Sequence, residues 1–298
     1  MTLDPLTSGG YPALYEQANA ASLRGQSRYL QALRFRLSGM IAATIGGTVI
    51  LASGYNLIGG WVALLGFLIA IAAESYSSIT APDKAWYEGR AAAESVKTLT
   101  WRYVVRGSTF AGEPDKESDR RFLERLRDAL HDLHEVELSE PSSGSEQITV
   151  AMKNLRASSF EDRKIAYRDG RIEDQRSWYA SKSEANGKAG RSWTLAILLL
   201  EGLGVVGAIL TIVGALSIDL LALFAAVAAA LTAWAQAKQH KNLATAYGIT
   251  AQELAGVKSE LALIGDEVGW ARFVNEAEEA ISREHTLWRA SRGVRIRK

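Results

Sequence analysis

Two long stretches of the chain are almost free of charge, and they dominate its hydrophobic pattern. No Asp, Glu, Lys or Arg occurs from Leu37 to Ala73, and only Glu201 and Asp219 interrupt the run between Arg191 and Lys238. A membrane-spanning helix needs about 20 apolar residues. Each stretch is therefore long enough for two such helices, and the pattern predicts two hairpins with four spans in all.

Turn-forming residues divide each stretch near its middle. Ser, Gly and Asn are concentrated in residues 53–60 of the first stretch, and Ser-Ile-Asp occupies residues 217–219 of the second. The predicted spans are residues 37–52, 61–79, 193–216 and 220–237. Trp61, Trp193 and Trp234 fall near the ends of these spans, where tryptophan side chains act as membrane-interface anchors.

The polar segments beside each hairpin have helical periodicity. Residues 15–37 lead directly into the first span, and apolar positions recur at helical spacing through residues 86–103 after it. Before the second hairpin, Ser158 and Glu161 form a predicted capping box. An apolar stripe with a seven-residue repeat follows at Ile165, Ile172 and Tyr179. A coiled-coil-like stripe with steps of four and three comes after that hairpin, at Leu243, Tyr247, Thr250, Leu254, Val257, Leu261 and Ile264.

These patterns predict an all-α membrane protein made of two tandem units, each a two-span hairpin between polar helices. The first unit covers residues 1–110, a linker covers 111–157, and the second unit covers 158–298. In and beside the linker, residues 107–119 and 139–146 are rich in Gly, Ser, Pro and acidic residues, and are predicted loops. Between them, an amphipathic helix carries Phe122, Leu123, Leu126, Leu130 and Leu133. We expect this helix to pack on a cytoplasmic helical bundle, which a C-terminal helix completes.

Composition narrows the class of protein. The chain has 298 residues, a formal net charge of +1 and no cysteine. Disulfide frameworks and cysteine-ligated zinc are excluded, and the near-neutral charge argues against a protein that coats nucleic acid. A large soluble helical core is the alternative to the membrane, because buried helices are also apolar on all sides. Two successive hairpins this free of charge would need an unusually large polar shell, so we favour the membrane.

The distribution of basic residues predicts the orientation. Cationic side chains border only the ends of the hairpins that open toward the polar segments, and the two hairpin tips have none. By the positive-inside rule, both termini and the middle segment are then cytoplasmic. We expect a multi-pass protein of the cell inner membrane. The basic C-terminal tail, residues 289–298, is expected to touch anionic headgroups or to remain solvated.

Three features that suggest chemistry have simpler explanations. Residues 202–207 match G-x-G-x-x-G, but the segment continues into an apolar span with no polar face, which a dinucleotide-binding helix would need. Close helix packing in lipid explains Gly204, Gly207 and Ala208 better. His131 and His134 have ligand-like spacing but no third strong ligand. No hydrolase signature occurs, so we expect no enzymatic activity, no metal and no cofactor.

Glu201 stands apart from these features. It lies about two turns inside the third predicted span, where an ionisable side chain costs several kcal/mol unless it is paired or in contact with water. Two interpretations remain open. Glu201 either faces a water-filled pore in an oligomer, or it is a structural tie to a basic residue such as Lys188 or Arg191.

Two groups of polar and aromatic residues point to a family. The first follows the first hairpin in the segment 86–97 and includes Trp86, Arg90 and Glu94, with Trp101 and Tyr103 after it. The second lies near the C-terminus, in residues 273–288, and includes Glu276, Glu284, His285 and Trp288. With these residues and its two hairpins, the chain resembles the SMODS and SLOG-associating two-transmembrane effector superfamily, SLATT, present as two domains in tandem.

The resemblance implies a function that the hydrophobic pattern does not reveal. Members of this superfamily are thought to be membrane effectors of prokaryotic antiviral defence, of the abortive-infection type. They are thought to form pores or perturb the membrane when a nucleotide-linked sensor is triggered. The resemblance therefore implies a pore-forming effector or ion channel, and four spans per chain are too few to enclose a wide pore without a homo-oligomer.

The expected partners are membrane lipid, further copies of the chain, and a nucleotide-linked sensor or other defence-system protein, without sequence-specific nucleic acid binding. A small proton-coupled transporter is the alternative, because an intramembrane Glu can couple proton movement to a substrate. A passive membrane anchor for a partner complex is the third possibility.

Overall fold

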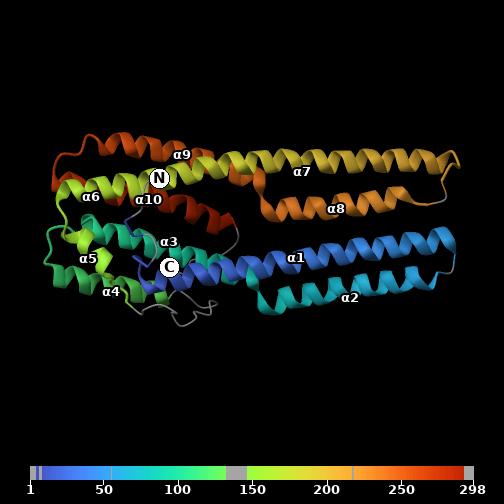
Figure 1. Cartoon of the computed structure of the whole chain (residues 1–298), viewed down its shortest axis with the longest axis horizontal. Coiled ribbons are helices and arrows are strands. Elements are labelled where there is room, and N and C mark those ends of the chain that lie inside the picture. The colour runs from blue at the N-terminus through green and yellow to red at the C-terminus, as the bar shows by residue number, and fades with distance from the viewer. Residues whose placement is uncertain (1–4, 7–8, 55, 132–145, 217, 292–298) are drawn as a thin grey trace. The chain divides into compact units, whose positions relative to one another are not determined.

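The computed structural model describes residues 5–6, 9–54, 56–131, 146–216 and 218–291, and every regular element within them is helical. This confirms the predicted all-α class. The elements, labelled in Figure 1, are α1 (Ala13–Ser53), α2 (Leu57–Thr80), α3 (Pro82–Val104), the 3-10 turn η1 (Ser108–Phe110), α4 (Asp115–His131), α5 (Val150–Ala157), α6 (Phe160–Tyr167), the π-helical η2 (Arg168–Glu173), α7 (Asp174–Ile212), α8 (Leu220–Lys238), α9 (His240–Leu261) and α10 (Glu267–Ser291).

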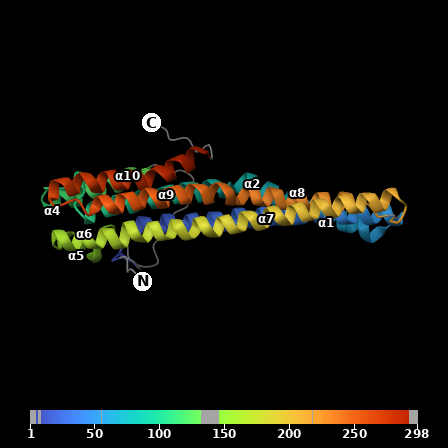
Figure 2. The same cartoon turned by 90° about the horizontal axis from the view of Figure 1, so that it is seen from above.

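Within the residues that the structure describes, four helical stretches are long and apolar enough to cross a membrane, as the hydrophobic pattern predicts. They are Ala13–Ala52, Leu57–Thr80, Phe160–Ile212 and Leu220–Leu261. The helices α1 and α2 run beside each other as one hairpin, and α7 and α8 as the other, in both perpendicular views (Figures 1 and 2).

The chain divides into two compact units, and each unit combines segments that are distant in the sequence. The span unit comprises Ser27–Pro82 and Ser183–Thr245, and thus contains both hairpins. The polar unit comprises Met1–Gln26, Asp83–Lys182 and Ala246–Lys298. In the span unit, large apolar side chains such as Leu51, Ile58 and Ile212 are at least three-quarters exposed. A continuous apolar surface of this kind requires a cover of lipid or protein.

Side-chain caps and left-handed glycines build the two hairpin tips. Asn56 accepts a hydrogen bond from the backbone N–H of Gly59 and caps α2, while Asp219 caps α8 in the same way through Ala222. Asp219, one of the two acidic residues in the second stretch, is therefore a helix cap. Because Gly214 turns the chain at φ 76°, α7 ends at Ile212, and the prediction of a span as far as residue 216 is wrong.

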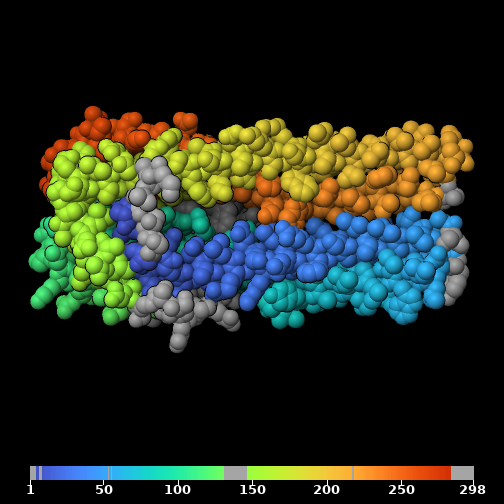
Figure 3. Space-filling view, viewed as in Figure 1, coloured from blue at the N-terminus to red at the C-terminus, as the bar shows by residue number. Residues whose placement is uncertain are grey.

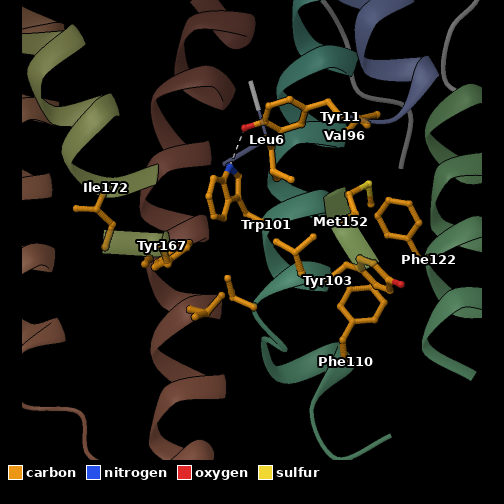
Figure 4. Close-up of a cluster of buried hydrophobic side chains, with 14 of the residues drawn as sticks. Leu6, Tyr11, Val96, Trp101, Tyr103, Phe110, Phe122, Met152, Tyr167 and Ile172 are labelled. Atoms are coloured by element: carbon orange, nitrogen blue, oxygen red, sulfur yellow. Dashed lines mark hydrogen bonds between the residues drawn. The ribbon is translucent and has the colours of Figure 1, made fainter. Parts of the chain in front are cut away.

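An aromatic cluster forms the core of the polar unit (Figure 4). Trp101 on α3 is fully buried and donates a hydrogen bond from Nε1 to the Tyr11 hydroxyl at 3.0 Å. Phe122 and Leu126 bring α4 onto this core, as predicted for the amphipathic helix, but Leu130 is 44% exposed. The helix begins at Asp115, so the predicted loop 107–119 is wrong over its last residues. Leu133 and His134 lie outside the described residues, and so does the predicted loop 139–146 except for residue 146.

Two predictions about α6 are wrong, and a π-helical segment explains one of them. Ser159, not Ser158, caps α6, with its Oγ accepting from the backbone N–H of Asp162. The π-helical turn η2 shifts the phase of the helix, because each turn of a π-helix holds more residues than an α-helical turn. Tyr167 is therefore buried where the seven-residue repeat placed Ile165, which is 47% exposed.

The stripe after the second hairpin packs mainly within the polar unit. Thr250, Leu254 and Leu261 on α9 are buried, and Val257 and Ile264 are partly buried against the aromatic core. The helix ends at Leu261, so the last position of the predicted stripe lies beyond it. A coiled coil between copies of the chain stays a prediction.

Candidate functional site

Small residues bring the backbones of the first hairpin into direct contact. The two facing rows, here called the glycine seam, are Gly39, Ala43 and Gly46 on α1 and Gly59, Ala63, Gly66 and Ala70 on α2. A Cβ added at Gly46 would lie 2.5 Å from the carbonyl oxygen of Gly59, and one at Gly66 would lie 2.6 Å from that of Gly39. In lipid, such close packing is a main source of helix association.

The second hairpin is packed less tightly at the positions that the sequence singled out. A Cβ at Gly207 would lie 2.7 Å from Cβ of Leu220, whereas one at Gly204 would lie 3.5 Å from Leu221 and Phe224, which is ordinary contact. Ala208 is half-buried. Residues 202–207 lie wholly inside the helix α7, without the loop that a phosphate-binding turn requires.

Glu201 is exposed on α7 within an apolar surface. Its neighbours one turn away, Leu198 and Val205, are 59% and 58% exposed. Within the described part of the chain, no hydrogen bond or ion pair involves the Glu201 carboxylate, and Lys188 pairs instead with Glu184 at 2.6 Å. A tie to Lys188 or Arg191 of the same chain is therefore not formed.

Aromatic and charged residues gather where the apolar stretches end. Trp234 on α8 meets two cations, since the Arg34 guanidinium on α1 is 5.2 Å and the Lys238 ammonium 5.4 Å from its ring centre. In Figure 3, the atoms of α1 lie directly against those of α8. Trp193 is half-buried and Trp61 is 56% exposed.

The family-like residues of the first group lie together in the polar unit. Trp101 and Tyr103 are buried in the aromatic core, Trp86 stacks on Tyr87, and Arg90 pairs with Glu94 at 2.8 Å. From the second group, Glu276 is exposed on α10. The backbones of Glu284, His285 and Trp288 belong to α10, but their side chains lie outside the described residues.

The polar unit contains a fully buried ion pair that the sequence pattern does not predict. Arg171, in the π-helical η2, donates to both carboxylate oxygens of Glu278 on α10, at 2.9 and 2.7 Å. The Tyr167 hydroxyl donates to the same carboxylate at 3.0 Å, and Thr98 accepts from Arg171 at 3.2 Å. Burial, and then the charge of Glu278, raises the pKa of Tyr167 well above its usual value.

The same pair shows how burial and attraction compete. Burial alone would lower the pKa of Arg171, but the adjacent Glu278 carboxylate outweighs it, and the net pKa is raised. The Arg171 guanidinium therefore remains charged inside the polar unit. Elsewhere, the described side chains include no group of three His, Asp or Glu that could hold a metal ion.

Comparison with protein families identifies both halves of the chain. Residues 12–164 match the SMODS and SLOG-associating two-transmembrane effector domain 3, and residues 167–288 match effector domain 1. The chain therefore belongs to the SLATT family and carries two of its domains in tandem, which confirms the resemblance. No curated protein and no solved structure matches the chain. These domains point to a multi-pass membrane effector of a defence system.

Proposed function

We propose that the chain is an oligomeric, pore-forming effector of the inner membrane, in which Glu201 faces the pore. Exposure of this carboxylate among apolar side chains of α7, without a partner in the described chain, is the observation that supports the proposal. In a lone chain Glu201 would face lipid, at a cost of several kcal/mol. Association of several chains about an axis would place it in water instead.

The polar unit has a regulatory role in this proposal. With both termini cytoplasmic, the polar unit, about three-fifths of the chain, would lie inside the cell, where a nucleotide-linked sensor or another defence protein can reach it. Reporters fused at Gly10, within the segment 107–146 and at Lys298 should all signal a cytoplasmic location. A periplasmic signal from the middle segment would contradict the proposed orientation. The proposal includes no enzymatic step, cofactor or metal.

Induction in living cells tests the proposal. Production or triggering of the wild-type chain should depolarise the inner membrane and arrest growth, while nucleic acid and nicotinamide cofactors remain intact. The variant Glu201→Gln should keep its expression level but depolarise the membrane to a different extent. Glu184→Gln is the matched control, because Glu184 is an exposed carboxylate of α7 outside the apolar stretch.

Other outcomes separate the remaining functions. Growth arrest with an intact membrane potential would contradict pore formation. Saturable exchange of a substrate, coupled to protons through Glu201, would indicate the transporter instead. Neither leakage nor exchange, together with capture of a partner complex, would indicate a passive membrane anchor.

A further inference from the structure

A groove of about 400 Å³ opens at the base of the second hairpin, within the span unit. It is lined by α7, by the last turns of α8 and by the first residues of α9. The break between α8 and α9 shapes it, because Gln239 adopts the left-handed conformation at φ 52° and redirects the chain. Among its lining residues, Lys241 packs so closely on Gly190 that a Cβ added at Gly190 would lie 3.2 Å from Cγ of Lys241.

The polarity of the residues that line this groove changes along the hairpin. Toward the spans it is formed by Trp193, Ile197 and Thr232, and toward the base by polar side chains that include Gln236 and Lys241. The apolar end thus adjoins the membrane-spanning stretch, and the polar end lies where that stretch stops. A ligand that fits both ends must itself be amphiphilic, with an apolar tail and a polar head.

The polar end of the groove carries one lysine, Lys241, and none of the residues that line the groove is Asp or Glu. The sequence contains no Asp or Glu between Glu184 and Glu201 on one side of the groove, or between Asp219 and Glu253 on the other. Over the same intervals it contains Lys188, Arg191, Lys238 and Lys241, of which Lys241 lines the groove, while Lys188 pairs with Glu184 at 2.6 Å. Near a membrane surface, each such cation attracts an anionic headgroup by about 1 kcal/mol.

We propose that this groove binds one anionic phospholipid. Its phosphate lies beside Lys241 and Gln236, its glycerol beside Trp193, and an acyl chain along Ile197 and Thr232. Indole rings favour this depth of the membrane, where one side is apolar and the other wet. The inference goes beyond pore formation, because a resting or non-conducting chain would bind the lipid equally.

The first hairpin offers an independent parallel. A groove of about 380 Å³ at its base is lined by Arg28 and Gln31 at one end and by Phe35 and Ile69 at the other. This lining also pairs a cation with apolar side chains where the charge-free stretch begins. Each of the two linings contains one Lys or Arg, Arg28 here and Lys241 in the second hairpin, so we expect a similar preference for anionic lipid at both grooves.

Native mass spectrometry of the full-length chain in detergent tests the proposal. With phosphatidylglycerol or phosphatidylcholine added at equal concentration, the first bound lipid should be phosphatidylglycerol, by at least about fivefold in affinity. Lys241→Gln should remove most of that preference, and Lys241→Arg should retain it. Lys116→Gln, an exposed residue of α4 with the same change in net charge, should have no effect.

A second variant separates binding from surface charge. Ala235→Phe fills the groove without changing any charge, and should lower the occupancy of both lipids. Equal binding of the two lipids by the wild-type chain, or equal effects of Lys241→Gln and Lys116→Gln, would overturn the proposal. So would glycerol 3-phosphate binding as tightly as the lipid, because the site would then recognise a free phosphate. If channel activity were absent while lipid binding remained intact, the result would contradict the proposed pore but not the proposed lipid site.

Discussion

The guanidinium of Arg34 on α1 lies 5.2 Å from the ring centre of Trp234 on α8. These residues come from the two different SLATT domains of the chain. Their contact therefore joins the two hairpins within the span unit. A tandem chain holds its two hairpins as a pair, whereas separate single-domain chains would have to find each other in the membrane.

A double-mutant cycle on this pair should reveal direct coupling. Arg34→Gln and Trp234→Leu should each destabilise the purified protein, and the double variant should be less destabilised than the sum of the two. The expected coupling is about 0.5–2 kcal/mol, the range for cation–π contacts from exposed to desolvated sites. Thermal unfolding in detergent measures it. Strict additivity of the two effects would mean that the contact contributes nothing.

Adjacent glycines on α1 give a matched test of the glycine seam. Gly46→Ala should destabilise the first hairpin, because its Cβ would meet the backbone of Gly59 and Ala63 at 2.5 Å. Gly47→Ala should be neutral or stabilising, because nothing lies within 4 Å of the new methyl group and alanine favours a helix by about 1 kcal/mol. Thermal unfolding of both variants in one detergent makes the comparison. Equal effects would contradict the close approach.

The buried pair of Arg171 and Glu278 should respond asymmetrically to substitution. Glu278→Gln leaves a buried guanidinium without its counter-charge and should destabilise the polar unit by about 3–5 kcal/mol. Replacing both residues with apolar ones, as in Arg171→Met with Glu278→Leu, should recover most of that loss. Near-ultraviolet circular dichroism during unfolding monitors the surrounding aromatic core. A double variant as unstable as the single one would show that the pair does more than neutralise charge.

Acid should weaken the end of the π-helical segment. Hydrogen bonds from Arg176 and then Lys258 lower the pKa of Glu173 from 4.5 to about 2. Because the folded-state pKa is depressed, this stabilisation is complete above about pH 4.5 and is lost as the pH falls toward 2. The stabilities of the wild type and Glu173→Gln should therefore converge over that window. Replacing both Arg176 and Lys258 with Gln should abolish the convergence.

The number of spans and the helical class could be predicted from the sequence because both depend on local composition. Runs without charge identify membrane helices whatever they pack against. The packing partners could not be predicted, because they depend on helix phase in three dimensions. Gly46 and Gly47 are neighbours with the same side chain, yet only Gly46 meets α2.

The buried contacts of the polar unit could not be predicted from the sequence for a related reason. Arg171 is one of many charged residues in a polar segment, and its partner Glu278 lies 107 positions away. The π-helical turn also breaks the seven-residue repeat that placed Ile165 in the core. Glu201, by contrast, can be singled out from the sequence alone, because a carboxylate inside a long apolar run is recognisable without knowledge of the fold.

Single-channel recording tests the proposed pore most directly. The full chain, reconstituted in planar bilayers and triggered, should give discrete currents that favour cations. Glu201→Gln should form oligomers of unchanged size, while its conductance or cation preference falls, because the amide removes only the charge. Glu184→Gln should match the wild type. A monomeric chain without currents, or currents identical in wild type and Glu201→Gln, would contradict a pore lined by Glu201.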